Sequence, residues 1–184
     1  MLLSLLLKNF GLKFIVKPAN IIECNRKEGA DFSNFVKKLA KEKAEEIARD
    51  NKDAVIIAAD TIVVFRNRII GKPHNPEDAF KTLNRLSNKW HKVYTGVYIK
   101  NPLKKRDYSV YELTRVKFRK LSGEEIIKYI KSGSPMDKAG SYGIQDDFGC
   151  TFVEKIVGDY FNVVGLPVLK TYEGLKKVLN KELF

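Results

Sequence analysis

The sequence predicts a mixed α/β fold, with a twisted sheet and flanking helices. The hydrophobic pattern switches repeatedly between a period of two residues and a period of three to four, which indicates interleaved strands and helices. With 184 residues, of which 44% are hydrophobic, the chain can bury the core of one ordinary domain. It contains no repeat, low-complexity tract or long linker. We therefore expect a single domain over residues 1–184.

The first 50 residues are expected to form two helices with a short strand between them. Residues 2–10 resemble the end of a helix that stops near Gly11, and Leu12 to Val16 resembles a short strand. From about Ser33 to Asp50, apolar residues fall on one face of a helix, and Lys43 lies on that face. Lys43 is therefore directed inward, unless its stem packs while its ammonium group reaches solvent.

A hairpin and a capped helix are expected next. Val55 to Phe65 is an apolar run of strand length, and the chain turns at Asn67 and returns briefly. Asn75 is a favourable N-cap residue, and Pro76 and two acidic residues follow it in the first turn, where they suit the helix dipole. This helix is expected to end near Ser87.

The remaining residues are expected to form a strand pair, two helices and a further strand around a long loop. Ser122 and Glu125 form a capping box, which predicts the start of a short helix, and Gly133 predicts its end. The other expected elements are strands over about 92–100 and 108–119 with a turn at Asn101 and Pro102, a loop over 136–149, a strand over 151–157 and a helix over about 169–179.

The formal charge of +12 raises the question of a nucleic-acid partner, because basic surfaces attract phosphates of any sequence. However, the lysines are scattered beside glutamates along helices, and no basic stripe with interleaved aromatic residues is present. We therefore expect a solvated, lysine-rich surface and no dedicated nucleic-acid binding. The charge still favours a small polyanionic substrate.

Cysteine and histidine usage gives little sign of metal or nucleophilic chemistry. Cys24 and Cys150 are far apart and have no Cys or His nearby at metal-ligand spacing, so they are interpreted as reduced thiols of a cytoplasmic protein. No segment is long and apolar enough to predict a membrane span. His74 and His91 are the only histidines, and we expect them to be surface or packing residues.

One acidic residue inside an apolar run indicates an active site. Asp60 lies in AVIIAADTIVVF, and Lys72 follows it just before a proline in IIGKP. An ionised carboxylate in a buried strand costs several kcal/mol unless a cation, a metal or several donors meet it. We therefore expect a positive charge opposite Asp60. The alternative is that Asp60 merely ends one strand and begins a turn.

Four segments together resemble the Maf family of nucleoside triphosphate pyrophosphatases. They are AADTIVVF with IIGKP, LSNKWHKVYTGV, DKAGSYGIQ and GDYFNVVGLP, and their order and spacing cover nearly the whole chain from Gly11 onward. The resemblance implies two lobes around a central cleft. It also implies hydrolysis of a nucleoside triphosphate to the monophosphate and pyrophosphate, assisted by a divalent cation such as Mg²⁺ or Mn²⁺, and a homodimer.

The resemblance also implies roles for individual residues. Asp60 would be the proton acceptor, Glu23 in the IIE segment would share metal binding with Asp60, and Lys43 and Lys72 would face the phosphates. Carboxylate oxygens from Glu23 and Asp60 suit Mg²⁺ or Mn²⁺ and leave room for water and phosphate oxygens. Without the resemblance, Glu23 would be interpreted as an ordinary acidic loop residue.

Thr61 and Gln145 are candidates for base recognition, because a hydroxyl and a primary amide can satisfy the hydrogen-bonding edge of a pyrimidine. ADT together with YGIQ resembles the members that act on dTTP and UTP. The alternatives are strand propensity for Thr61 and loop stabilisation by Gln145. The glycines Gly140, Gly143 and Gly149 could let backbone amides approach a ligand.

One signature of the family is missing. Members begin with a strand followed by SxSPRR, whose serine and arginines grip the triphosphate, whereas Leu2 and Leu3 stand here where the arginines should be. The domain is therefore expected to be shortened at its N-terminus. Either the true start lies upstream of Met1, or the chain is a shortened relative that folds but hydrolyses less efficiently. An inactive nucleotide-binding protein with a role in cell division is the alternative function.

Overall fold

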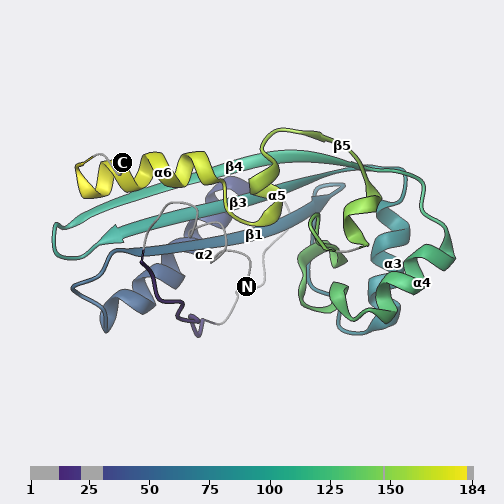
Figure 1. The fold of residues 1–184 in the computed structure, drawn as a ribbon, viewed down its shortest axis with the longest axis horizontal. Coiled ribbons are helices and arrows are strands. Elements are labelled where there is room, and N and C mark those ends of the chain that lie inside the picture. The colour runs from purple at the N-terminus through teal and green to yellow at the C-terminus, as the bar shows by residue number, and fades with distance from the viewer. Residues whose placement is uncertain (1–12, 22–30, 147, 182–184) are drawn as a thin grey trace. The chain divides into compact units, whose positions relative to one another are not determined.

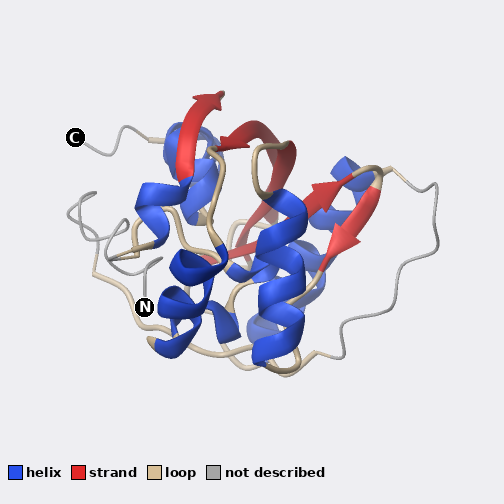
Figure 2. Ribbon diagram, turned by 90° about the vertical axis from the view of Figure 1, so that its right-hand side faces the viewer, coloured by secondary structure: helices blue, strands red, loops and turns tan. Residues whose placement is uncertain are grey.

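The structure is a computed structural model that describes residues 13–21, 31–146 and 148–181 (Figure 1). Helices and strands both make up large parts of it (Figure 2), so the predicted mixed α/β class is confirmed. The chain divides into two compact units. Of the described residues, unit 1 comprises 13–21, 31–60, 95–112 and 165–181, and unit 2 comprises 61–94, 113–146 and 148–164.

Within the described residues, the strands form one five-stranded sheet in the order β2-β1-β3-β4-β5. β1 pairs antiparallel with β2, and β4 pairs antiparallel with β5. Three of the strands, β1, β3 and β4, contribute residues to both units. The strands are β1 (Ile56–Phe65), β2 (Arg68–Ile70), β3 (Trp90–Asn101), β4 (Arg106–Phe118) and β5 (Val153–Val157).

In unit 1, helices α2 (Phe32–Arg49) and α6 (Val168–Leu179) pack on opposite faces of the strands (Figure 1). The buried alanines of α2 pack on Ile56 and Tyr98. α6 lies close to the other face, where a Cβ added to Gly174 would be 2.3 Å from the ring of Tyr108. Small residues on both helices therefore let them approach the sheet closely.

The closest approach in unit 1 is between α2 and β3. A Cβ added to Gly96 would lie 2.3 Å from both the carbonyl carbon and the carbonyl oxygen of Val36. Real Cβ contacts are never this short, and the neighbour is helix backbone rather than a flexible side chain. Glycine at position 96 is thus required for α2 to lie where it does.

Unit 2 has a larger apolar core that includes Leu83 and Leu86 of α3, Phe118 of β4 and Tyr129 of α4. The predicted caps are present: the Asn75 side chain accepts a hydrogen bond from the backbone of Asp78 at 2.9 Å, and the capping box at the start of α4 is complete. The helices of this unit are α3 (Pro76–Leu86), α4 (Gly123–Lys131), α5 (Tyr160–Val164) and the 3-10 helices η1 (Ser134–Asp137), η2 (Ala139–Ser141) and η3 (Gly149–Phe152).

Several expectations about single elements need correction. The strand expected at 12–16 is wrong for residues 13–16, which form neither helix nor strand. The side chains of Ile15 and Val16 are 84% and 46% exposed, so the described elements do not bury this apolar pattern. The helix expected over 2–10 lies outside the described residues. The last strand begins at Val153 rather than 151 because η3 precedes it, and α5 was not expected.

His91 is buried in unit 2 and His74 is exposed, so the expectation that the histidines are packing or surface residues is confirmed. Nε2 of His91 lies 2.8 Å from the hydroxyl oxygen of Tyr142, and the His91 ring meets the ring of Phe118 edge-on. Burial lowers the pKa of His91 to about 4. None of the described helices has the length and apolar character needed to cross a membrane.

We expect His91 to make the folded state sensitive to acid. The folded protein favours the neutral imidazole, so this contribution to stability is fully present above about pH 6.5 and is lost as the pH falls toward 4. Between these pH values, the free energy of unfolding of the wild type should fall by about 3 kcal/mol more than that of His91→Gln. Urea denaturation at a series of pH values measures this difference. His74→Gln is the matched control and should keep the wild-type pH dependence; a wild-type slope in His91→Gln would contradict the expectation.

We also expect Gly96→Ala to be strongly destabilising, because the new methyl group would overlap the backbone of α2. Overpacking typically costs about 1–3 kcal/mol, and a backbone neighbour that cannot rotate away places this variant at the upper end. Gly123→Ala is the control, since the nearest atom to its Cβ would be 3.9 Å away. Chemical denaturation should show a large loss for Gly96→Ala and little change for Gly123→Ala. Equal stabilities would mean that α2 does not rest on β3 at this point.

Candidate active site

Asp60 is buried at the centre of β1 and faces Lys43 of α2. The side chains of Asp60 and Lys43 are 8% and 24% exposed, and Nζ of Lys43 donates a hydrogen bond to Oδ1 of Asp60. The expectation that a positive charge lies opposite Asp60 is thus confirmed. Lys43 points inward, and its ammonium group does not simply extend to solvent. The ion pair offsets part of the cost of removing the carboxylate from water.

The packing of α2 brings Lys43 to this position. The close contact of Gly96 with Val36 fixes the distance between the helix and the strand, and Lys43 follows Val36 by about two helical turns. A second contact lies beyond it, where Nζ of Lys100 on β3 is 2.6 Å from a carboxylate oxygen of Glu45. Contacts on both sides of Lys43 therefore hold the helix, and the lysine with it, against the strands of unit 1.

Lys72 and Gln145 lie in unit 2 and are exposed, on two loops that are joined to each other. The backbone N–H of Gly140 donates to the carbonyl oxygen of Gly71 at 3.1 Å. Gly140 has a φ of +74°, and a Cβ there would lie 2.9 Å from a methyl group of Val63. Only glycine suits this junction, which connects the GKP segment to the segment that precedes Gln145.

Thr61 follows Asp60 directly in β1 and is half-buried. Successive side chains of a strand point to opposite faces, so Thr61 shares its face with Val63, a member of the unit 2 core. Asp60 shares the other face with Ile56, which packs on α2. The two neighbouring side chains therefore have different surroundings.

The expected metal site is only partly described. Glu23 lies outside the described residues. Among those that are described, no group of three His, Cys, Asp or Glu side chains is placed to hold a metal ion. Asp60 provides a hard oxygen ligand, and Mg²⁺ is often held by only one or two carboxylates together with waters and substrate phosphates. The described part of the site fits this open kind of coordination and not a closed protein cage.

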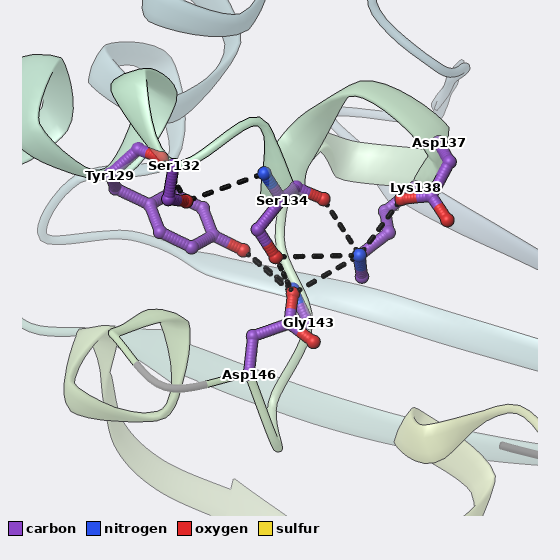
Figure 3. Close-up of polar contacts among 7 residues, drawn as sticks. All are labelled: Tyr129, Ser132, Ser134, Asp137, Lys138, Gly143 and Asp146. Atoms are coloured by element: carbon purple, nitrogen blue, oxygen red, sulfur yellow. Dashed lines mark hydrogen bonds and ion pairs between the residues drawn. The ribbon is translucent and has the colours of Figure 1, made fainter. Parts of the chain in front are cut away.

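Asp137 and Lys138 form an ion pair near Lys72 that was not expected from the sequence. Nζ of Lys138 lies 2.8 Å from a carboxylate oxygen of Asp137 and 3.2 Å from one of Asp146 (Figure 3). The hydrogen bond from Lys138 lowers the pKa of Asp137, and the charge of Lys72 adds to this effect. Burial lowers the pKa of Lys138, but the hydrogen bonds to Asp137 and Asp146 outweigh burial and raise it. The sequence does place an acidic and a basic residue side by side at the start of DKAG, which is the pattern that could have predicted this ion pair.

The glycines of the loop after η1 serve packing inside the protein. The N–H of Gly140 donates to the carbonyl oxygen of Gly71, and the N–H of Gly143 donates to the hydroxyl oxygen of Tyr129 at 3.2 Å. These two amides are therefore not offered to a ligand, contrary to expectation. A Cβ on Gly149 would lie 2.6 Å from the carbonyl oxygen of Gly143, so this glycine too is explained by close packing.

The sequence is similar to those of known proteins. Residues 4–178 match a protein family described as Maf-like protein. The chain is 46% identical over 175 residues to the dTTP/UTP pyrophosphatase of Aquifex aeolicus (strain VF5), covering 95% of this chain and 90% of that protein. It is 48% identical over 169 residues to the dTTP/UTP pyrophosphatase of Thermosipho melanesiensis (strain DSM 12029 / CIP 104789 / BI429), covering 91% and 88%. The chain therefore belongs to the Maf family.

Proposed function

We propose that this protein hydrolyses dTTP and UTP to the nucleoside monophosphate and pyrophosphate. The observation that carries the proposal is the buried Asp60 that faces Lys43 on a closely packed helix. Removing a carboxylate and an ammonium group from water is costly, so a buried ion pair beside an otherwise apolar strand is a candidate for a functional role. The similarity to relatives named dTTP/UTP pyrophosphatase supports the substrate class.

In the proposed reaction, a water oxygen forms a bond to the α-phosphorus, and the bond from that phosphorus to the bridging oxygen breaks, which releases pyrophosphate. Asp60 accepts the proton of the attacking water, a role that typically contributes about 10²- to 10⁴-fold in rate. Lys43 orients the Asp60 carboxylate through its hydrogen bond. Because an ammonium group has three donor hydrogens, this contact is compatible with a second contact to a phosphate oxygen.

We assign neutralisation of the remaining negative charge on the triphosphate to Lys72 and to a divalent cation. Lys72 lies exposed at the GKP loop, where a long cationic side chain can reach phosphate oxygens. We propose that Asp60 and Glu23 hold the cation, Mg²⁺ or Mn²⁺. When bound, this ion supplies positive charge to the phosphate oxygens as the bond to the leaving group breaks.

Base recognition is assigned to Thr61 and Gln145. The amide of Gln145 carries both donors and an acceptor, and the Thr61 hydroxyl can do either, so together they can match a pyrimidine edge. A base with the wrong edge would cover one of these polar groups and leave it without a partner, which is the physical source of the selectivity.

The alternative, an inactive nucleotide-binding protein with a role in cell division, is not favoured, because the relatives at 46% and 48% identity are named as pyrophosphatases. A dedicated nucleic-acid surface is not proposed either. The cytoplasmic location, inferred from cysteine usage, stays a prediction. The homodimer, which the resemblance implies, also stays a prediction.

We expect Asp60→Asn to release pyrophosphate from dTTP about 10²- to 10⁴-fold more slowly than the wild type, because an amide keeps the shape of the carboxylate but cannot accept the proton. The measurement is the initial rate with Mg²⁺ or Mn²⁺, with circular dichroism to verify folding. Asp53→Asn, the same chemical change at an exposed residue, should keep the wild-type rate. Equal rates for wild type and Asp60→Asn would remove Asp60 from the mechanism.

A further inference from the structure

Gln145 lies in a tight turn within unit 2. The backbone N–H of Asp146 donates to the carbonyl oxygen of Gly143 at 3.2 Å, which closes a four-residue turn with Ile144 and Gln145 at its centre. Ile144 is buried in the core, whereas Gln145 is exposed. The turn therefore anchors one central side chain and presents the other outward.

A single buried hydroxyl group holds both ends of this turn. The hydroxyl of Tyr129 donates to Oδ2 of Asp146 at 3.0 Å and accepts the backbone N–H of Gly143 at 3.2 Å (Figure 3). Tyr129 is 1% exposed, and its ring packs edge-on against Phe152 with centroids 5.0 Å apart. Because the ring is fixed in the core, its hydroxyl is a rigid point of attachment for the turn.

The carboxylate of Asp146 is held by two more donors. The Ser134 hydroxyl donates to Oδ2 of Asp146, and Nζ of Lys138 lies 3.2 Å from the same oxygen (Figure 3). Lys138 is itself fixed by the carbonyl oxygen of Ser134 at 2.6 Å and by the carboxylate of Asp137. Asp146 thus connects the turn to η1 as well as to α4.

The turn is closely packed at two glycines. A Cβ added to Gly143 would lie 2.4 Å from the carboxylate of Asp146. A Cβ added to Gly149 would lie 2.6 Å from the carbonyl oxygen of Gly143 and 2.9 Å from the hydroxyl of Tyr129. Two glycines are therefore needed where the backbone surrounds these polar groups.

We propose that Tyr129 and Asp146 are positioning residues that set nucleotide selectivity by holding Gln145 in its binding geometry. This inference rests on the proposed function, in which Gln145 contacts the base. A fixed turn orders the backbone that carries the Gln145 amide, so that less conformational entropy is lost when the nucleotide binds. Loosening the turn should weaken recognition of the base while leaving the reaction at the phosphates intact.

The test is a kinetic comparison of Tyr129→Phe with Gln145→Ala, using pyrophosphate release from dTTP and from the mismatched purine dGTP. Tyr129→Phe keeps the buried ring and removes only the hydroxyl. We expect KM for dTTP to rise by about tenfold, the loss expected for one or two hydrogen bonds, with kcat within about twofold. The preference for dTTP over dGTP should fall in parallel.

Two further variants separate positioning from general loosening of the core. The double variant Tyr129→Phe with Gln145→Ala should match Gln145→Ala alone, because a residue that acts through Gln145 has no effect once its amide is gone. Tyr142→Phe removes another buried hydroxyl from the same core, one that bonds to His91. It should leave KM and the dTTP preference at wild-type values. If Tyr129→Phe does not fold, Asp146→Asn should show the same KM effect.

The outcomes distinguish this inference from the proposed function. If the wild type releases pyrophosphate from dTTP but Tyr129→Phe and Asp146→Asn keep its KM and preference, the inference is overturned and the proposed function stands. Equal effects of Tyr129→Phe and Tyr142→Phe, or additive effects in the double variant, would also overturn the inference. A wild type that releases no pyrophosphate from dTTP or UTP would overturn both.

Discussion

The ion pair between Lys43 and Asp60 is the constraint on which the arrangement of unit 1 depends. A carboxylate at the centre of a buried strand requires a cation within reach, and the cation comes from a helix on the face of the sheet. That helix must lie closer than ordinary side chains allow, which explains the buried alanines of α2 and the glycine at position 96. Residues without polar side chains thus determine where the charges meet.

The two units hold the residues to which roles are assigned in different ways. In unit 1, Lys43 and Asp60 project from a helix and a strand, and packing between these elements fixes their positions. In unit 2, Lys72 and Gln145 project from loops, and hydrogen bonds within the unit give these loops a definite shape. Regular elements hold the groups assigned to proton transfer, while a braced loop holds the group assigned to the base. Buried hydroxyls and tight glycines replace secondary structure there.

Local patterns predicted the features that local physics decides. The capping box at Ser122, the inward face of the helix carrying Lys43 and the buried position of Asp60 are all visible within a few residues of sequence. The failures involve partners that are distant in sequence. Residues 13–16 have a strand-like pattern but pair with none of the described strands. Tyr129 resembles an ordinary core aromatic in the sequence, and its hydrogen bond to Asp146, 17 residues later, appears only in the fold. The remaining site assignments stay predictions.

Because β1, β3 and β4 each contribute to both compact units, neither unit is encoded by one continuous stretch of the gene. A fragment that ended between Asp60 and Thr61 would cut a strand in half and leave unpaired backbone in both pieces. Each unit therefore depends on segments that lie on both sides of a segment of the other unit in the sequence. Each core joins segments that are distant in sequence, which slows folding. The core of unit 1 also needs α6, so it cannot be completed before that helix has been synthesised.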